Sequence, residues 1–404
     1  MALITGNQLR AARALVGVEQ RWLADSSGVS VNTIRNMEAR AASEITSGAV
    51  TVRKVQAVLE ACGVEFSNGG RPGVKLRHPS EGRLEGRLIS NGRQRLMQVV
   101  SIINYKGGVG KTSLTANLGA ELAWRGKKVL LIDLDAQASL TFSFIKPEDW
   151  IKSFADHRTI KSWFDAYEKG KPIELSSLVY TPPRIKIRLV GKGQLDIICS
   201  HLGLINVDLD LAVKLGGASL TQAKFNFINI HSRLSAGLQE AAFAPYNVIL
   251  IDCPPNFNIV TKTAIVASDY IMVPTRPDHL STLGIDYLMR NVEKLTKDYN
   301  DYAEVDTGDK VDKIEPKTVG IVFTMIQEYG GQPIAAQRAF MQQLKRNTTT
   351  PVFQHYIKRN DTLFADAPVY GIPVVLNGYD SDSHQSVVTG LEGVTDDFVA
   401  AVGI

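Results

Sequence analysis

From Met97 onward, short apolar runs alternate with longer stretches of helical periodicity, such as Thr112–Trp124 and Thr282–Lys297. Several runs carry β-branched residues on both faces, as parallel strands buried on both sides do. Strands are predicted at Gln98–Asn104, Lys128–Asp133, Leu195–Ser200, Val248–Asp252, Tyr270–Pro274 and Val319–Thr324. This alternation predicts an α/β domain, doubly wound around a mostly parallel sheet.

The amino-terminal part follows a different pattern, in which short helices succeed one another. Helices are predicted at Asn7–Val16, Glu19–Ser26, Val31–Arg40 and Val52–Cys62. Gly28 permits a tight turn before the third helix, and Ser30 is its predicted cap. Glycine, proline and arginine then dominate as far as residue 95, a composition typical of turns and linkers. We therefore predict a small all-α domain at 1–68, a basic linker at 69–95 and the α/β domain at 96–404.

Composition narrows the class of protein. The chain has 404 residues, 44% of them hydrophobic, which suits a soluble protein with a substantial core. It contains no apolar run of about 18 residues and no secretory layout at its start, so we expect no membrane span and a cytoplasmic location. Three scattered cysteines fit a reducing compartment. Residues 1–95 hold 14 Lys and Arg against 8 Asp and Glu, an excess that attracts polyanions.

The stretch between the first predicted strand and its helix carries the strongest chemical signal. Its glycines can turn backbone N–H groups inward to cradle an anion, and the helix start adds free donors. Lys111 is expected to reach the phosphates of a nucleotide, and Thr112 to place its hydroxyl on Mg²⁺. The predicted nucleotide-binding residues are Gly107, Gly108, Val109, Gly110, Lys111, Thr112 and Ser113.

The same stretch departs from the general phosphate-loop pattern, because Tyr105 occupies the first glycine position and Lys106 follows it. The run Lys-Gly-Gly-Val-Gly-Lys-Thr resembles the deviant Walker A sequence of the ParA/MinD class of ATPases. That resemblance implies an ATPase that uses ATP and Mg²⁺ and forms an ATP-bound sandwich homodimer. Lys106 matches the lysine that reaches the partner's nucleotide, and acts in the way an arginine finger does.

Two further strand ends carry carboxylates. Asp133-Leu134-Asp135-Ala136-Gln137 resembles the family's D-x-D-P-Q segment, with Ala136 in place of proline. The resemblance gives Asp135 the role of positioning or deprotonating the attacking water, whereas Asp133 is expected to shape the loop. Asp252 ends a Walker B-like strand and is expected to orient Mg²⁺ through a water.

The carboxyl-terminal part extends the resemblance to about Val375. Ile357-Lys358-Arg359-Asn360 resembles a family segment in which an arginine contacts DNA without sequence preference, so Lys358 and Arg359 are predicted DNA contacts. Lys358 stands where the family usually has proline. The family often carries an arginine soon after the late strand, but this chain has Gln327-Glu328-Tyr329-Gly330-Gly331 there.

The amino-terminal helices resemble the λ-repressor-like helix-turn-helix family in the spacing from Gln20 to Glu38. The start of the third helix would then meet base edges through Asn32, Thr33, Arg35 and Asn36, and Arg40 at its end would hold phosphates. A small helical bundle that binds protein is the other reading. Residues 1–68 have only 7 basic against 6 acidic residues, so tight DNA binding would need a dimer or the basic linker.

Together these resemblances imply a nucleoid-associated partition ATPase with a ParB-like partner that stimulates hydrolysis, and with autoregulation through the helix-turn-helix. An ATP-responsive transcriptional regulator and a positioning ATPase for a cargo other than DNA stay open. A MinD-like membrane switch is disfavoured, because residues Thr395–Ile404 include two aspartates and no lysine. A nitrogenase-reductase-like electron carrier is disfavoured, because the cysteines offer no cluster-binding arrangement.

Overall fold

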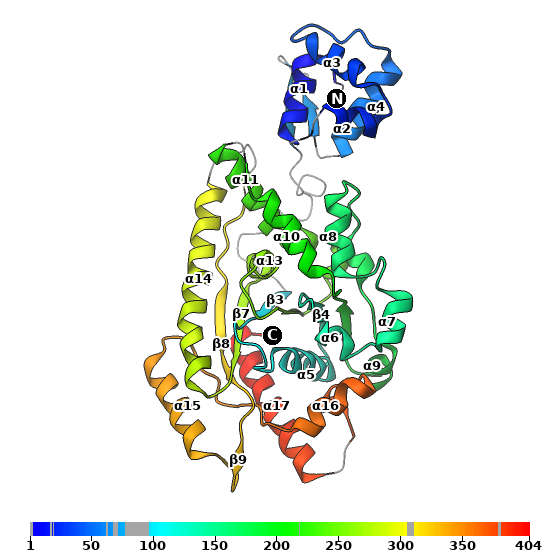
Figure 1. The fold of residues 1–404 in the computed structure, drawn as a ribbon. Helices are drawn as coiled ribbons and strands as arrows, with labels where there is room; N and C mark the ends of the chain where they lie inside the picture. Colours follow the sequence, from blue (N-terminus) through cyan, green and yellow to red (C-terminus); the bar gives the residue numbers. More distant parts are fainter. Residues whose placement is uncertain are drawn as a thin grey trace. The chain divides into compact units, whose positions relative to one another are not determined.

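The computed structural model describes residues 3–16, 18, 20–61, 64–67, 72–76, 97–217, 219–304, 311–378 and 381–404. The chain divides into two compact units (Figure 1): the first comprises Met1–Arg93 and Tyr167–Pro172, and the second Gln94–Ala166 and Ile173–Ile404. Each unit has a hydrophobic core of its own. Within the described residues, no helix is both long enough and apolar enough to cross a bilayer.

The amino-terminal unit contains the four predicted helices, each within three residues of its predicted bounds. They are α1 (Gly6–Leu15), α2 (Gln20–Ser27), α3 (Val31–Ala39) and α4 (Ala49–Ala61). Gly28 adopts a left-handed φ of +64° between α2 and α3. The Ser30 side chain accepts a hydrogen bond from the Thr33 amide, as predicted for the cap of α3. Ile34 is fully buried, and Val29 packs against the same core.

A β-hairpin follows these helices, so the prediction of an all-α unit was wrong. Strand β1 (Val64–Ser67) pairs antiparallel with β2 (Gly73–Leu76), which lies inside the predicted linker. Val64 and Phe66 alternate with polar residues and point into the core. The Gln8 amide donates to the carbonyls of Ser67 and Gly73, at 3.2 and 3.1 Å, which joins α1 to both strands. Residues 69–71 and 77–95 of the predicted linker lie outside the described residues.

The second unit is built on a six-stranded parallel sheet, which confirms the predicted α/β class. Its strands are β3 (Gln98–Ile102), β4 (Lys128–Asp133), β5 (Gln194–Ile198), β6 (Val248–Asp252), β7 (Tyr270–Thr275) and β8 (Lys317–Phe323). The strand order is β5-β4-β6-β3-β7-β8, so the chain leaves β3 in both directions. Successive residues of β3 enter opposite cores: Val99 packs on one face of the sheet and Val100 on the other.

Helices cover both faces of this sheet (Figure 1). One core receives residues from α5 (Lys111–Trp124), α6 (Ser139–Phe142), α7 (Pro147–Ser153), α9 (Pro183–Arg188), α16 (Asp361–Tyr370), η4 (Val374–Leu376) and α17 (Asp382–Val402). The other receives residues from α8 (Ile160–Glu168), η2 (Leu175–Leu178), α10 (Leu204–Lys214), α11 (Leu220–His231), α12 (Arg233–Gly237), η3 (Ala241–Phe243), α13 (Ile259–Ala267) and α14 (His279–Ala303). Beyond β8 lie the short strands β9 (Glu328–Tyr329) and β10 (Gln332–Pro333) and helix α15 (Ala335–Asn347).

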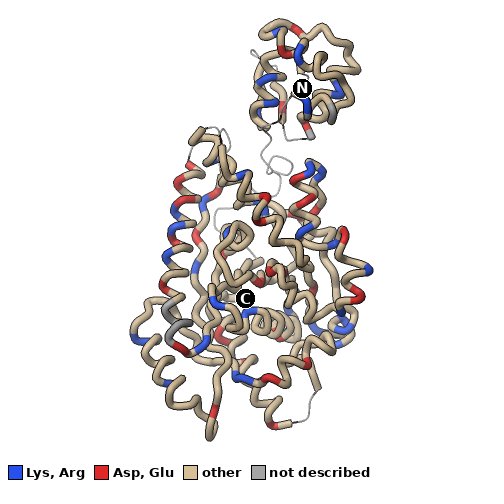
Figure 2. Tube along the Cα trace, viewed as in Figure 1, with Lys and Arg blue, Asp and Glu red and all other residues tan. Residues whose placement is uncertain are grey.

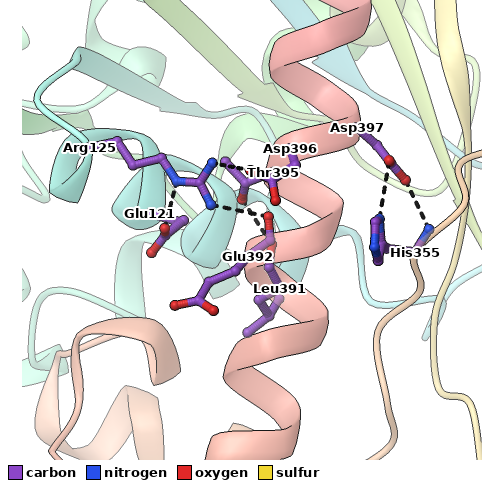
Figure 3. A network of polar contacts seen from close by, with 8 residues as sticks. All are labelled: Glu121, Arg125, His355, Leu391, Glu392, Thr395, Asp396 and Asp397. Atoms are coloured by element: carbon purple, nitrogen blue, oxygen red, sulfur yellow. Dashed lines mark hydrogen bonds and ion pairs between the residues drawn. The ribbon is translucent and has the colours of Figure 1, made fainter.

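Polar contacts fix the far end of α5 to the carboxyl-terminal helix (Figure 3). Arg125 donates to Glu121 at 2.7 Å, pairs with Asp396 and donates to the Glu392 carbonyl at 3.2 Å. On the other side of α17, Asp397 accepts hydrogen bonds from the backbone amide and ring of His355. Helix α17 therefore braces the helix whose amino terminus opens the candidate site.

Candidate functional site

The three segments singled out in the sequence meet at the carboxyl edge of the sheet. Asp252 at the end of β6 lies level with Ile102 of β3 and with Asp133 of β4. The loop from Asn104 to Gly110 leaves β3 at this edge and leads into α5. The fold therefore brings the predicted phosphate loop and both carboxylate segments together.

Two glycines of this loop adopt backbone conformations that other residues rarely take. Gly108 has a φ of +68° and Gly110 a φ of +77°. A Cβ on Gly107 or Gly108 would meet nothing within 4 Å, so Gly108 is required by its conformation and not by crowding. Gly110 opens α5 without a side-chain cap. The first turn of α5 therefore presents backbone donors of the kind that bind phosphate.

Lys111 lies within the curve of the loop. Its side-chain amine donates to the carbonyls of Asn104 and Lys106, at 3.2 and 3.3 Å, and the residue is 7% exposed. Burial lowers the pKa of Lys111, and the carboxylates of Asp252 and Asp135 oppose that shift. A cation held at the centre of a glycine loop suits the charge of a bound polyphosphate.

Thr112 and Asp252 form a contact that supplies adjacent oxygen ligands. The Thr112 hydroxyl donates to Asp252 at 2.7 Å, and Thr115 donates to the other carboxylate oxygen at 3.5 Å. Within the described residues, no group of three or more His, Cys, Asp or Glu could hold a metal ion. A hydroxyl beside one carboxylate fits Mg²⁺, which keeps several waters and takes further oxygens from phosphates.

Asp133 shapes the loop that carries Asp135, as the sequence predicts. Its fully buried carboxylate accepts hydrogen bonds from the Thr141 amide and hydroxyl, at 2.8 and 2.7 Å, and from the Asp135 amide at 3.1 Å. Burial and the nearby charge of Asp252 raise the pKa of Asp133 to about 8. These bonds hold the loop in place.

Asp135 keeps a half-buried side chain at the same edge of the sheet. Its carboxylate accepts from the Gln137 amide at 3.0 Å, while its carbonyl accepts from the Ser200 hydroxyl at 2.7 Å. Ser200, which lies just beyond β5, thus holds the backbone of Asp135 through a contact that the sequence does not reveal. Its carboxylate remains partly accessible from solvent, as an acid-base group for a bound substrate must be.

Lys106 pairs with a carboxylate of its own chain. Its amine lies 2.9 and 3.1 Å from the two oxygens of Asp278, in the loop between β7 and α14. Its backbone amide donates to the Asn104 side chain at 2.9 Å. Both side chains of the pair are partly exposed, at 34% and 42%. The sequence does not reveal this pair, because 172 positions separate the two residues.

The structure accounts for Tyr105 at the first glycine position. Its ring packs against Phe257 and Tyr287, with centroids 6.0 and 5.5 Å apart. Its hydroxyl accepts a hydrogen bond from Asn291 at 2.8 Å. The residue therefore fastens the front of the loop to the start of α13 and to α14.

Thr324 is a site residue that sequence reasoning missed. Its hydroxyl donates to the Val109 carbonyl at 2.7 Å and is buried beneath the loop. The next residue, Met325, has a φ of +57° and lies where a Cβ on Gly110 would touch it. Thr324 directly follows β8, so a polar residue at the carboxyl end of a parallel strand was the available signal.

The predicted DNA contacts of the amino-terminal unit lie mostly at its surface. Asn32, Arg35, Asn36 and Arg40 are exposed, and Thr33 is half-buried. Arg35 donates to Gln20 at 3.4 Å, and Arg40 donates to the Thr46 hydroxyl at 2.8 Å. This exposed polar face suits a recognition helix.

The predicted DNA contacts of the second unit are engaged by carboxylates. Lys358 lies 2.7 Å from Glu328 and also contacts the Ser386 hydroxyl. Arg359 makes a two-oxygen contact with Asp361, with a shortest distance of 2.7 Å. Both cations are therefore locally neutralised in this structure.

Comparison with known proteins agrees with this architecture. The Bacillus subtilis sporulation initiation inhibitor protein Soj is 27% identical over 292 residues, covering 72% of this chain and 94% of Soj. The chromosome partitioning protein ParA of Caulobacter vibrioides is 27% identical over 280 residues, covering 69% and 87%.

Two solved structures share the fold. A Cyanothece McdA–ATP complex has a TM-score of 0.56 and 19% identity, covering 77% of this chain and 98% of McdA. A Borrelia burgdorferi plasmid partition protein bound to AMPPNP has a TM-score of 0.52 and 19% identity, covering 75% and 98%. A family model described as an AAA domain matches residues 97–305, more than half of the chain and the whole candidate loop. The chain therefore belongs to this AAA domain family.

Proposed function

We propose that this protein is a ParA-like partition ATPase, which dimerises around ATP, binds DNA in that form and releases it after hydrolysis. The likeness to Soj and to ParA supports the class. The observation that carries the proposal is the loop with two lysines, Lys106 and Lys111, set beside the Thr112–Asp252 contact.

Each residue of the site has a role in this scheme. Backbone groups of residues 107–113 bind the phosphates of ATP, and Lys111 neutralises their charge. Thr112 holds Mg²⁺ directly, and Asp252 orients it through a water. Bound Mg²⁺ supplies charge neutralisation on the phosphate oxygens. Asp135 positions the attacking water.

Lys106 acts across the dimer. In the scheme it leaves Asp278 and reaches the triphosphate of the facing subunit, where it stabilises developing charge. Because each subunit lends its lysine to the other, ATP binding and dimer formation are coupled. Hydrolysis converts the γ-phosphoryl group into free phosphate, and departure of that phosphate removes the charge that holds the lysine and so releases the dimer.

DNA and protein partners complete the proposal. The ATP dimer binds DNA without sequence preference, with Lys358 and Arg359 as contacts once they leave their carboxylate partners. The amino-terminal unit binds an operator through the exposed start of α3 and autoregulates the partition genes. A ParB-like protein stimulates hydrolysis, and the protein acts in the cytoplasm on the nucleoid.

Three single substitutions test the proposal. Lys111→Ala removes ATP binding, whereas Lys106→Ala retains ATP binding and loses the ATP dimer. Asp135→Ala binds ATP and stays dimeric, because hydrolysis is blocked. Equilibrium binding of a fluorescent ATP analogue and analytical ultracentrifugation distinguish the three. A Lys106→Ala protein that dimerises normally with ATP would refute the proposal.

An ATP-responsive transcriptional regulator is the second candidate, favoured by the exposed polar face of α3. The rate of ATP hydrolysis distinguishes the partition ATPase from the transcriptional regulator. The partition ATPase hydrolyses ATP faster with DNA and a ParB-like partner, whereas the regulator needs only to bind ATP. Footprinting of the full chain on its own promoter tests operator binding in either case.

A further inference from the structure

Helix α9 lies along the edge of the sheet. Before α9, Tyr180 forms an isolated antiparallel bridge with Ile197 of β5. After α9, a turn leads directly into the start of β5. There Gly193 donates to the Ala123 carbonyl, and Gln194 donates to the carbonyl of Lys127. The chain thus places α9 beside the loop that precedes β4.

This region carries a concentration of positive charge, which we call the α9 basic surface. Blue segments gather around α9 in Figure 2. The residues of the surface are Lys127, Lys128, Arg184, Lys186, Arg188 and Lys192. All are exposed except Lys127, which is half-buried. No Asp or Glu occurs between residues 175 and 195. The chain itself therefore supplies no neutralising charge within this segment.

Buried side chains of α9 hold the α9 basic surface towards solvent, and its cations are not paired with carboxylates of the described residues. Ile185 and Leu189 anchor α9 in the core, with 0% and 5% exposure. Arg184 donates to the Tyr370 carbonyl, and Lys192 lies 4.5 Å above the ring of Trp124. In the part of the chain that the structure describes, none of the six cations forms an ion pair with a carboxylate.

The surface is separate from the candidate nucleotide site. Lys128 and Gln194 begin β4 and β5 at the amino edge of the sheet, whereas Asp133 and Asp252 end β4 and β6 at the carboxyl edge. A ligand on the α9 basic surface can therefore bind without covering the phosphate loop. Helix α16, about 15 Å long at 1.5 Å per residue, leads from Arg359 to the Arg184 contact.

We propose that the α9 basic surface binds the phosphate backbone of duplex DNA. This inference rests on the proposed function, and it assigns DNA contacts outside the segment that resembles the family's DNA-binding residues. Long, exposed and unpaired cations suit phosphates, which duplex DNA carries at one per about 1.7 Å of axis. Lys358 and Arg359 must first break ion pairs, whereas these six cations need not.

An anionic membrane is the other surface that such charge could meet. Ile187 and Val190 are exposed, at 73% and 79%, but α9 has only six residues. Two apolar side chains on a helix this short bury little area in a bilayer, where amphipathic helices use a long apolar face. The balance of many cations and little apolar area favours DNA.

A charge-removal pair tests the inference on the full chain. Lys186→Gln with Arg188→Gln removes two cations of the surface, and Lys294→Gln with Lys297→Gln is the control on the exposed side of α14. Binding to a labelled 60-base-pair duplex of random sequence is measured with ATP across a salt series. Counterion release predicts that the slope of log affinity against log salt falls by about 1.8 for two lost phosphate contacts. Affinity at about 0.1 M salt falls roughly 10- to 60-fold, and the control stays within about twofold of the wild type.

The outcomes separate this inference from the proposed function. If the wild type does not bind DNA with ATP, the proposed function itself fails. If the wild type binds and the α9 pair binds equally, with the same salt slope, only the inference is overturned. Thermal melting and ATP turnover check the folding of the variant, and Lys128→Gln with Lys192→Gln provides a second pair. If the α9 pair loses binding to vesicles containing 30% phosphatidylglycerol but binds DNA as the wild type does, the inference is also overturned.

Discussion

Neutralising Asp278 is expected to tighten the ATP dimer. In the structure Asp278 holds Lys106 by two contacts, at 2.9 and 3.1 Å. The proposed mechanism requires that lysine to leave Asp278 for the partner's nucleotide. Asp278→Asn keeps the size of the side chain, removes its charge and replaces one of the two oxygens that accept from Lys106 by an amide donor. The substitution therefore weakens the contact that competes with dimer formation.

The solvent exposure of the Lys106–Asp278 pair determines how much its loss is expected to change the affinity of the dimer. Its side chains are 34% and 42% exposed, so solvent screens the attraction and the pair is worth about 0.2–1 kcal/mol. Two such pairs break in each dimer, which doubles the effect to about 0.4–2 kcal/mol. At 1.4 kcal/mol per factor of ten, the dimer tightens by roughly 2- to 30-fold. The gain shrinks as salt rises, because ions screen the pair further.

Sedimentation velocity with ATP measures this effect, in an Asp135→Ala background that prevents hydrolysis. Asp286→Asn makes the same chemical change at an exposed position of α14 and serves as the control. A weaker dimer in Asp278→Asn would contradict the reasoning, since it would mean that Asp278 supports the assembled dimer. Equal dimer affinity in both variants would show that the Lys106–Asp278 pair does not compete with assembly.

The other predictions concern the loop and its support. Burial raises the pKa of Asp252 from 3.8 to about 7, so its contribution to the free energy of unfolding is fully present below pH 3.8 and is lost as pH rises towards 7. Without nucleotide, the stability of Asp252→Asn relative to wild type should therefore rise between pH 4 and 8 in urea denaturation; a constant difference would refute the shift. Thr324→Val leaves the Val109 carbonyl without its 2.7 Å donor, and should cost about 1–3 kcal/mol of unfolding free energy and weaken ATP binding; unchanged values for both would exclude a supporting role. Gly108→Ala forces a side chain into a φ of +68° and should cost about 1–2 kcal/mol, whereas Gly107→Ala, which has equal space and no left-handed backbone, should be nearly neutral; equal melting temperatures for the two would contradict the conformational argument.

Local pattern predicted the sheet well, because its strands are buried on both faces. The predicted bounds of β4 and β6 are those observed, and β3 differs only at its carboxyl end. The hairpin after α4 was missed, because four-residue strands within a glycine- and proline-rich stretch resemble a linker. Its pairing depends on long-range contacts with Gln8, which composition does not report.

The positions of the candidate site residues could be predicted where one continuous segment of the sequence carries them. Lys111 and Thr112 follow from the loop, and Asp133 takes the structural role expected of it. Asp278 and Thr324 were not predicted, because each reaches the loop from a different strand end. Arg359 was predicted from resemblance, which does not reveal that Asp361 holds it.

The role of Lys106 across the dimer can be seen in a structure of the Asp135→Ala protein with ATP and Mg²⁺. We expect two facing subunits, with each Lys106 amine within about 3.2 Å of a phosphate oxygen on the partner's nucleotide. A bound nucleotide with Lys106 still on Asp278, and no facing subunit, would contradict it.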